Sequence, residues 1–434
     1  MLLLASGHGY TQAPRTLAES AARAMLMFPE VRAAAANWRA IGQTIAQARA
    51  GYLPSVDLSL GYGSETSDNI STRTTGRDVT LQRREAEITL SQLLFDGGVV
   101  GGQVRRGEAR TRSAENQFSA AAESAANRAA QAHLEVRRLL GLVQLGQDNV
   151  KRHEETLVQV GSLADSGRGR RVDTQQTEAR LAFAQASLAQ LRGQLAQAED
   201  AFRHLVGEAP GELADPGDFL ARLPLSLEAA LERALSTHPS IRAVEQDLQA
   251  ASADRESARA RLQIPRIALE AGGTHSQNLD GLRGLNADQY AVVRLRAPLF
   301  RGGADDARVR ETEERIDEAY FNVGKARNDV ERELRQAWDT LREDRSRFPQ
   351  LGRYVTATSE VVSAYRAQFM IGQRTLLDVL NAENELFGAK SSLYSGLFAV
   401  TAGEIRVLAA SGMLLDSLSI AVPAGSQMSN PSRR

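Results

Sequence analysis

The residue types that most often perform catalysis or bind metals are scattered along this 434-residue chain. Cysteine is absent, which excludes thiolate catalysis, disulfides and Cys-ligated metal sites. The histidines do not fall at metal-ligand spacings, and the sequence has no nucleophile elbow. We therefore predict no catalytic residue, no metal site, no cofactor and no enzymatic activity. The histidines, which we expect on surfaces or between helices, are His8, His133, His153, His204, His238 and His275.

A glycine run at 97–102 lies between an expected strand and an expected helix, where a phosphate-binding loop would lie. No Gly-Lys-Ser/Thr follows it, and the matching place later in the chain keeps only Gly302-Gly303. This disfavours nucleotide binding. The net charge is −1, and no basic stripe or tail stands out from the mixed charges of helix faces. Nucleic acid is therefore not an expected partner.

Near residue 372 a long helical pattern stops at a glycine, and a second helical pattern begins a few residues later. Gly372 suits the left-handed residue that closes a helix, Thr375 suits the cap of the next helix, and a new apolar period begins at Leu376. The same pattern occurs earlier, where Gly167 is followed by Arg170 and a second apolar run. We predict two tips of helical hairpins, at about 164–173 and about 369–378.

The two tips belong to two copies of one longer pattern. The helical pattern of residues 16–49 recurs at 226–259, an offset of about 210 residues. Each copy continues with a proline, two strand patterns, a Leu-Phe-x-Gly-Gly ending and a long helical stretch. The predicted divisions are an N-terminal segment at 1–15, a first repeat at 16–210, a linker at 211–225, a second repeat at 226–415 and a disordered tail at 416–434.

Each copy contains one hairpin of two strands, because apolar and polar residues alternate on both sides of a polar turn. The strands are predicted at about 54–63 and 85–95, and at about 265–273 and 289–299. One hairpin is marginal alone, and in a membrane its unpaired edges are forbidden. Four strands are fewer than the usual minimum of about eight for a closed barrel. Several chains would have to pool their strands; a small soluble sheet is the alternative.

Two arginines on the last strand indicate which way that strand faces. An arginine facing lipid at mid-membrane would cost about 2–4 kcal/mol. We therefore expect Arg294 and Arg296 to face an aqueous lumen.

The remaining sequence predicts long helices. About 70 residues separate each glycine pair from its tip, which is roughly 100 Å of helix. Pro349 should kink or break the second of these helices. After each tip, a helix of about 35 residues follows, and the second carries two apolar stripes that predict neighbours on two sides.

Signals for membrane insertion by helices are weak. No stretch approaches the ~20 apolar residues of a membrane helix. Residues 1–15 lack a basic n-region and a full apolar h-region. A signal-peptide remnant and an ordinary frayed N-terminus both stay open for this segment.

With the duplication, the Leu-Phe-x-Gly-Gly endings and the tip at 372–384 in place, the chain resembles the TolC family of bacterial outer-membrane channel proteins over nearly its whole length. The resemblance implies a mainly α fold with a small β part. It also implies a homotrimer whose twelve strands form one outer-membrane barrel, continued by a periplasmic α-helical tunnel. The sequences of segments 167–173, 175–181 and 372–384 look most like those of the type I protein-secretion subgroup.

The resemblance also implies roles for tip residues. Asp378 matches an acidic gate position; an exposed aspartate favoured by the helix dipole is the alternative. The second acidic gate position is Asn381 here. Arg374 and Asp173 match a latch between hairpins, and Phe369 lacks the hydroxyl that some members use in it. The residues matched to tip turns and to adaptor contact are Gly167, Gly372, Arg170, Thr375 and Leu376.

The implied function is an exit channel of a type I secretion system that passes an unfolded protein, such as an RTX toxin or adhesin, to the cell exterior. The implied partners are two further copies of the chain, a periplasmic adaptor, an inner-membrane ABC transporter, the exported protein and outer-membrane lipid. A small-molecule efflux duct is the alternative within this class. A soluble periplasmic helical adaptor is the alternative outside it.

Overall fold

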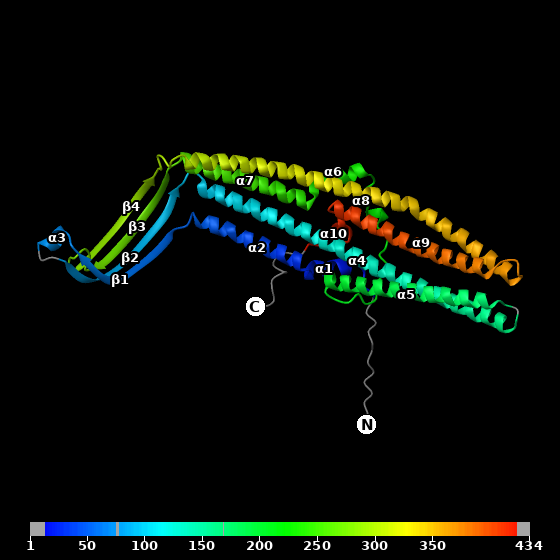
Figure 1. Ribbon diagram of the computed structural model, residues 1–434. Helices are drawn as coiled ribbons and strands as arrows, with labels where there is room; N and C mark the ends of the chain where they lie inside the picture. The colour runs from blue at the N-terminus through cyan, green and yellow to red at the C-terminus, as the bar shows by residue number, and fades with distance from the viewer. Residues whose placement is uncertain (1–13, 75–77, 168, 423–434) are drawn as a thin grey trace, which may run out of the picture. The chain divides into compact units, whose positions relative to one another are not determined.

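The computed structural model describes residues 14–74, 78–167 and 169–422. Most of the possible signal remnant, and residues 423–434 of the predicted tail, lie outside the described residues. The described chain divides into two compact units, one containing residues 37–116 and 242–325 and the other containing the rest. The chain passes from one unit to the other within four helices, α2, α4, α7 and α8 (Figure 1).

The order of elements is duplicated, as the sequence predicted. The first repeat consists of α1 (Leu17–Met27), α2 (Pro29–Ala50), β1 (Ser55–Ser67), α3 (Ile70–Arg73), β2 (Val79–Phe95), α4 (Val99–Asp165) and α5 (Arg171–Val206). The second repeat consists of α6 (Leu227–Thr237), α7 (Pro239–Gln263), β3 (Arg266–Gln277), β4 (Leu285–Arg296), α8 (Ala304–Met370) and α9 (Leu376–Ala410). The short elements η1 (Leu220–Arg222) and α10 (Leu414–Ser417) follow the two repeats. The predicted mainly α fold with a small β part is confirmed.

The four strands form one antiparallel sheet in the order β1-β2-β3-β4. They extend further toward the hairpin turns than the apolar alternation predicted, because the pairs near the turns are polar. Thr66 and Thr80 pair directly, for example, and their hydroxyls are 2.9 Å apart. At the other end β4 stops at Arg296 rather than at 299, and Pro298, which lacks a backbone N–H, follows.

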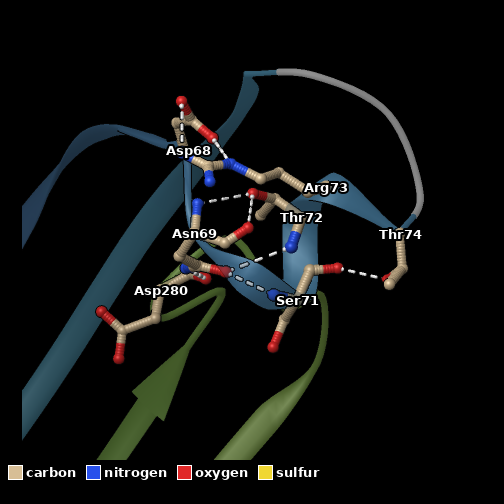
Figure 2. Close-up of polar contacts among 7 residues, drawn as sticks. All are labelled: Asp68, Asn69, Ser71, Thr72, Arg73, Thr74 and Asp280. Atoms are coloured by element: carbon tan, nitrogen blue, oxygen red, sulfur yellow. Dashed lines mark hydrogen bonds and ion pairs between the residues drawn. The ribbon is translucent and has the colours of Figure 1, made fainter.

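The turns of the two hairpins are joined to each other. Asn69 caps α3 by accepting from the backbone N–H groups of Ser71 (2.9 Å) and Thr72 (3.1 Å). Its amide nitrogen donates to the carbonyl oxygen of Asp280, in the β3–β4 turn, at 2.8 Å (Figure 2). This contact links residues far apart in the sequence, so the two hairpins are tied together at their turns as well as along β2 and β3.

Each repeat builds an equivalent apolar core from its first helix, its long helix and its return helix. In the first repeat the core residues come from α1, α4 and α5 and from Leu213 of the linker, and in the second they come from α6, α7, α8 and α9. The buried members are Ala24, Ala129, Val136, Phe202, Val206 and Leu213 in one cluster, and Ala230, Ala234, Ile241, Val330, Leu334, Leu341, Val407 and Ala410 in the other. Alanine is frequent in both clusters, so the helices can approach closely.

The sequence predicted a kink or a break at Pro349; the helix α8 continues through this residue, so no break occurs. Proline removes one backbone hydrogen bond, and α9 packs closely against α8 at this place. A Cβ added to Gly396 of α9 would lie 2.8 Å from Leu351 and 3.4 Å from Phe348 of α8. The residues on both sides of Pro349 therefore pack closely against a glycine of the neighbouring helix.

By length and composition alone, the helix α9 is apolar enough to cross a membrane, which the sequence did not predict. Half of its most apolar stretch is buried inside the fold. Gly396 meets α8, and Tyr394 meets Gly141 of α4. The apolar character of α9 thus reflects neighbours on two sides, as its two stripes predicted.

The linker and the start of the predicted tail are both ordered against the helices. Arg15 pairs with Leu213 in a short parallel bridge, and Phe219 is buried. The sequence predicted disorder from residue 416, whereas Leu418 is also buried. The backbone N–H of Leu415 points at the Glu123 carboxylate at 3.4 Å, and burial raises the pKa of this carboxyl to about 7. Apolar burial therefore extends past the predicted end of the repeat.

The contact between Gly141 and Tyr394 predicts a strong dependence on side-chain size. An added Cβ at Gly141 would overlap the Tyr394 ring, and Phe398 lies beside that ring, 5.2 Å between centroids. We expect Gly141→Ala to lower the free energy of unfolding by about 1–3 kcal/mol. Gly193→Ala on α5, where no atom lies within 4 Å, should instead raise it by about 0.5–1 kcal/mol. Thermal unfolding followed by circular dichroism measures both; equal shifts would contradict the packing described here.

Candidate functional site

The sheet has one apolar and one polar face, because its pairing register aligns the period-two patterns of all four strands. Most of the larger apolar side chains are exposed and the others are half-buried; Leu58 is 67% exposed and Val293 is 66% exposed. An exposed apolar surface of this extent marks a site that contacts protein or membrane. Its larger side chains are Val56, Leu58, Leu60, Tyr62, Ile88, Leu90, Ile267, Leu269, Val293 and Leu295.

The two arginines singled out from the sequence lie on the polar face and share one carboxylate. Arg294 donates to Glu270 at 2.5 Å and Arg296 contacts the other oxygen of the same carboxylate at 3.0 Å. The Glu270 side chain is 15% exposed. Sequence reasoning did not single out Glu270, although its place opposite Val292 follows once the β3–β4 register is known. Polar residues on this face make it suitable for contact with water.

The α8–α9 tip has the local structure that its turn residues predicted. Gly372 adopts φ 76°, a left-handed conformation, and its N–H donates to the Phe369 carbonyl at 2.9 Å. Thr375 caps α9 by accepting from the Asp378 N–H at 3.3 Å, and its hydroxyl donates to the Asp378 carboxylate at 2.8 Å. Asp378 therefore occupies the helix-start position that the sequence offered as the alternative to a gate role.

The expected latch residues do not meet within one chain. Arg374 donates to the Gln368 side chain at 3.1 Å, and its guanidinium lies over the Tyr365 ring, 4.1 Å from the centroid. Asp173 lies in the first turn of α5. Within the described residues no contact joins it to Arg374. The partners that Arg374 has within the chain are close to it in sequence, because Tyr365 and Gln368 lie near the end of α8 and Arg374 lies in the turn that follows.

Two further residues singled out from the sequence, Leu376 and Phe369, belong to an apolar cluster near the tips. Leu376 is only 3% exposed and packs with Val160 of α4 and Leu380 of α9, and Phe369 packs against this cluster. The side chain of Leu376 is therefore not available to an adaptor, contrary to the sequence expectation. Gly167, Arg170, Gly372 and Thr375 are exposed.

A polar contact joins the second gate position to the neighbouring hairpin. The Asn381 side-chain oxygen accepts from Arg180 of α5 at 2.6 Å. This bond connects α9 to α5. The uncharged asparagine thus accepts a hydrogen bond from a charged arginine at a position where an aspartate would form an ion pair.

Sequence reasoning missed a buried polar group near the tips. Glu383 of α9 is almost fully buried and pairs with Arg366 of α8 at 2.7 Å, while its second oxygen has no partner in the described chain. His153 of α4 is also buried; burial lowers its pKa, and Glu383 acts in the opposite sense. A charged residue next to the buried stripe position Ala382 was the available signal. Among the described residues no cluster of His, Asp or Glu is suited to a metal ion.

Comparison with known proteins places these features in one family. The family described as outer membrane efflux protein matches residues 22–208, within the first repeat, and 230–412, within the second. The chain is 26% identical over 382 residues to the outer membrane efflux protein BepC of Brucella suis biovar 1, covering 88% of this chain and 82% of BepC. It is 25% identical over 378 residues to the alkaline protease secretion protein AprF of Pseudomonas aeruginosa, covering 84% and 78%.

A solved structure agrees in fold. The Campylobacter jejuni CmeC outer membrane channel has a TM-score of 0.80 and 15% identity, covering 96% of this chain and 90% of CmeC. Proteins of this family are transport channels, so the expectation that the chain is not an enzyme is confirmed by family membership. The chain belongs to the outer membrane efflux protein family, the TolC family of outer-membrane channels.

Proposed function

We propose that three copies of this chain form an outer-membrane exit duct, with the polar face of each sheet lining a water-filled channel. One observation carries the proposal. The sheet has two faces of opposite character, and β1 and β4 are edge strands whose outer backbone groups need partners in a membrane. Pairing β4 of one copy with β1 of the next satisfies those groups. It also turns Arg294 and Arg296 toward water and Val293 toward lipid.

The cargo we propose is an unfolded polypeptide exported by a type I secretion system. The name of AprF, a protease secretion protein, supports this class, as do the tip sequences at 167–173 and 372–384. The partners would be a periplasmic adaptor and an inner-membrane ABC transporter. The name of BepC favours the second candidate, a small-molecule efflux duct with the same architecture. The soluble-adaptor alternative disagrees with membership of a channel family.

At the tips we propose that Asp378 contributes to a ring of carboxylates in the trimer, with Asn381 beside it. Each carboxylate would raise the cost of ionising the others. We further propose that Arg374 of one copy reaches Asp173 of a neighbouring copy, because the two do not meet within the chain. The exposed tip residues Gly167, Arg170, Gly372 and Thr375 are the proposed adaptor contact.

The orientation of the sheet can be tested with two adjacent positions on β4. Val293→Cys should resist, and Arg294→Cys should accept, a membrane-impermeant maleimide in intact outer-membrane vesicles, because they lie on opposite faces. The chain has no cysteine of its own, so label on this protein reports the introduced cysteine alone. Equal labelling of the two variants would refute the assignment of lipid-facing and water-facing sides.

The cargo class can be tested by deleting the gene. We expect the deletion to remove a large protein from the culture medium while sensitivity to drugs and detergents stays the same. Restoring the gene on a plasmid is the control. Increased drug sensitivity with an unchanged set of secreted proteins would instead favour the efflux duct.

The proposed latch can be tested by charge reversal. In planar bilayers, Arg374→Glu and Asp173→Arg should each raise the closed-state conductance, and the double variant should restore it, because the two charges then attract again. Arg171→Glu, two residues from Asp173, is the matched control and should change little. Additive effects in the double variant would rule out direct pairing.

A further inference from the structure

A hollow lined by arginines lies at the helix end of the sheet. It is formed where β4 and α7 end and where β3 and α4 begin, and all of these segments belong to the same compact unit. Four arginines line it, and Asp96 is the one carboxylate among its lining residues. The arginines are Arg261, Arg266, Arg296 and Arg301.

The Asp96 carboxylate is already occupied by the start of α4. One oxygen accepts from the Gly98 N–H at 2.9 Å and the other from the Val100 N–H at 2.7 Å. In the second repeat Arg301 takes the place of Asp96, in Leu-Phe-Arg-Gly-Gly instead of Leu-Phe-Asp-Gly-Gly. The second repeat thus has a cation where the first has a helix-capping carboxylate, and among the described residues the Arg301 side chain has only a long contact of 3.5 Å with Asp305.

Two of the arginines lie directly opposite each other. Arg266 of β3 pairs with Arg296 of β4, a like-charge pair that is unfavourable in a sheet. Arg296 shares the single carboxylate of Glu270 with Arg294. In the described part of the chain, neither Arg261 nor Arg266 has a carboxylate within 4.0 Å. The hollow therefore holds more positive charge than its carboxylates balance.

We infer that this hollow binds carboxylate groups of an acidic polypeptide segment as it moves along the polar face. Guanidinium groups match the planar, two-oxygen geometry of carboxylates. Arg266 and Arg296 are on the face opposite Val293 and Leu295, which separates them from the proposed lipid side. The inference rests on the proposed function, because the channel face is where a cargo would meet these side chains.

The test measures binding and block separately. A fluorescent oligoglutamate peptide is titrated against the detergent-purified, full-length protein by anisotropy, and the same peptide is added to channels in planar bilayers. Arg266→Gln and Arg261→Gln should each weaken binding and block roughly five- to tenfold at about 0.1 M salt. Arg315→Gln is the matched control, because Arg315 lies outside the hollow on α8 and pairs with Glu318 at 2.8 Å.

The expected results include two features that a purely structural role would not produce. Binding should fall steeply as salt rises to about 1 M. Arg266→Gln should also unfold at the same temperature as the unchanged protein, or higher, because it removes a like-charge pair. Oligolysine should not bind.

The possible failures are distinguishable. Peptide binding that is equal in all variants, or binding of inorganic phosphate alone with the same dependence on arginine, would overturn the inference while leaving the exit duct intact. Arginine-dependent peptide binding to a protein that conducts no ions would support the hollow and overturn the proposed channel function.

Discussion

The backbone groups along the outer sides of β1 and β4 set the main constraint on this molecule. A sheet of four strands leaves two edges, and its apolar side chains on one face are exposed within a single chain. In water such edges invite aggregation, and in lipid they are not tolerated. Duplication gives four strands, which is still too few for closure, so the proposed trimer follows from this constraint together with the family. The polar face then has to line whatever space the strands enclose.

The helices meet a different constraint, because they must stay continuous over a great length. The helices α4 and α8 both have 67 residues. Small residues allow neighbouring helices to pack closely, also where the helix's own sequence predicts a kink or break. Pro349 illustrates this, since Gly396 on α9 accommodates the residues on both sides of the proline. The rule that proline breaks a helix considers one helix alone, and here the neighbouring helix also packs against the proline's surroundings.

The sequence was sufficient for features that repeat or that depend on neighbours in the chain. The duplication, the glycine turn at Gly372 and the cap at Thr375 are local or periodic, and the structure has all three. The ends of the strands were harder to predict, because polar pairs such as Thr66 and Thr80 continue the strand pairing without an apolar pattern. The contacts of the latch residues were the hardest to predict. Arg374 has several possible partners, and only the fold shows that Tyr365 and Gln368 occupy it within the chain.

The charge of the whole chain conceals how charge is distributed on the sheet. A net charge of −1 gives no reason to expect a strongly basic surface. On the polar face, however, the helix end carries Arg266 opposite Arg296, while nearer the hairpin turns Glu85 and Glu87 lie on the same face. In the proposed duct, such a face would interact differently with different segments of a cargo chain, because its two ends attract opposite charges. The equivalent position after the return strand is Asp96 in the first repeat and Arg301 in the second, so the charge at this place is set by the residue and not by the fold that the repeats share.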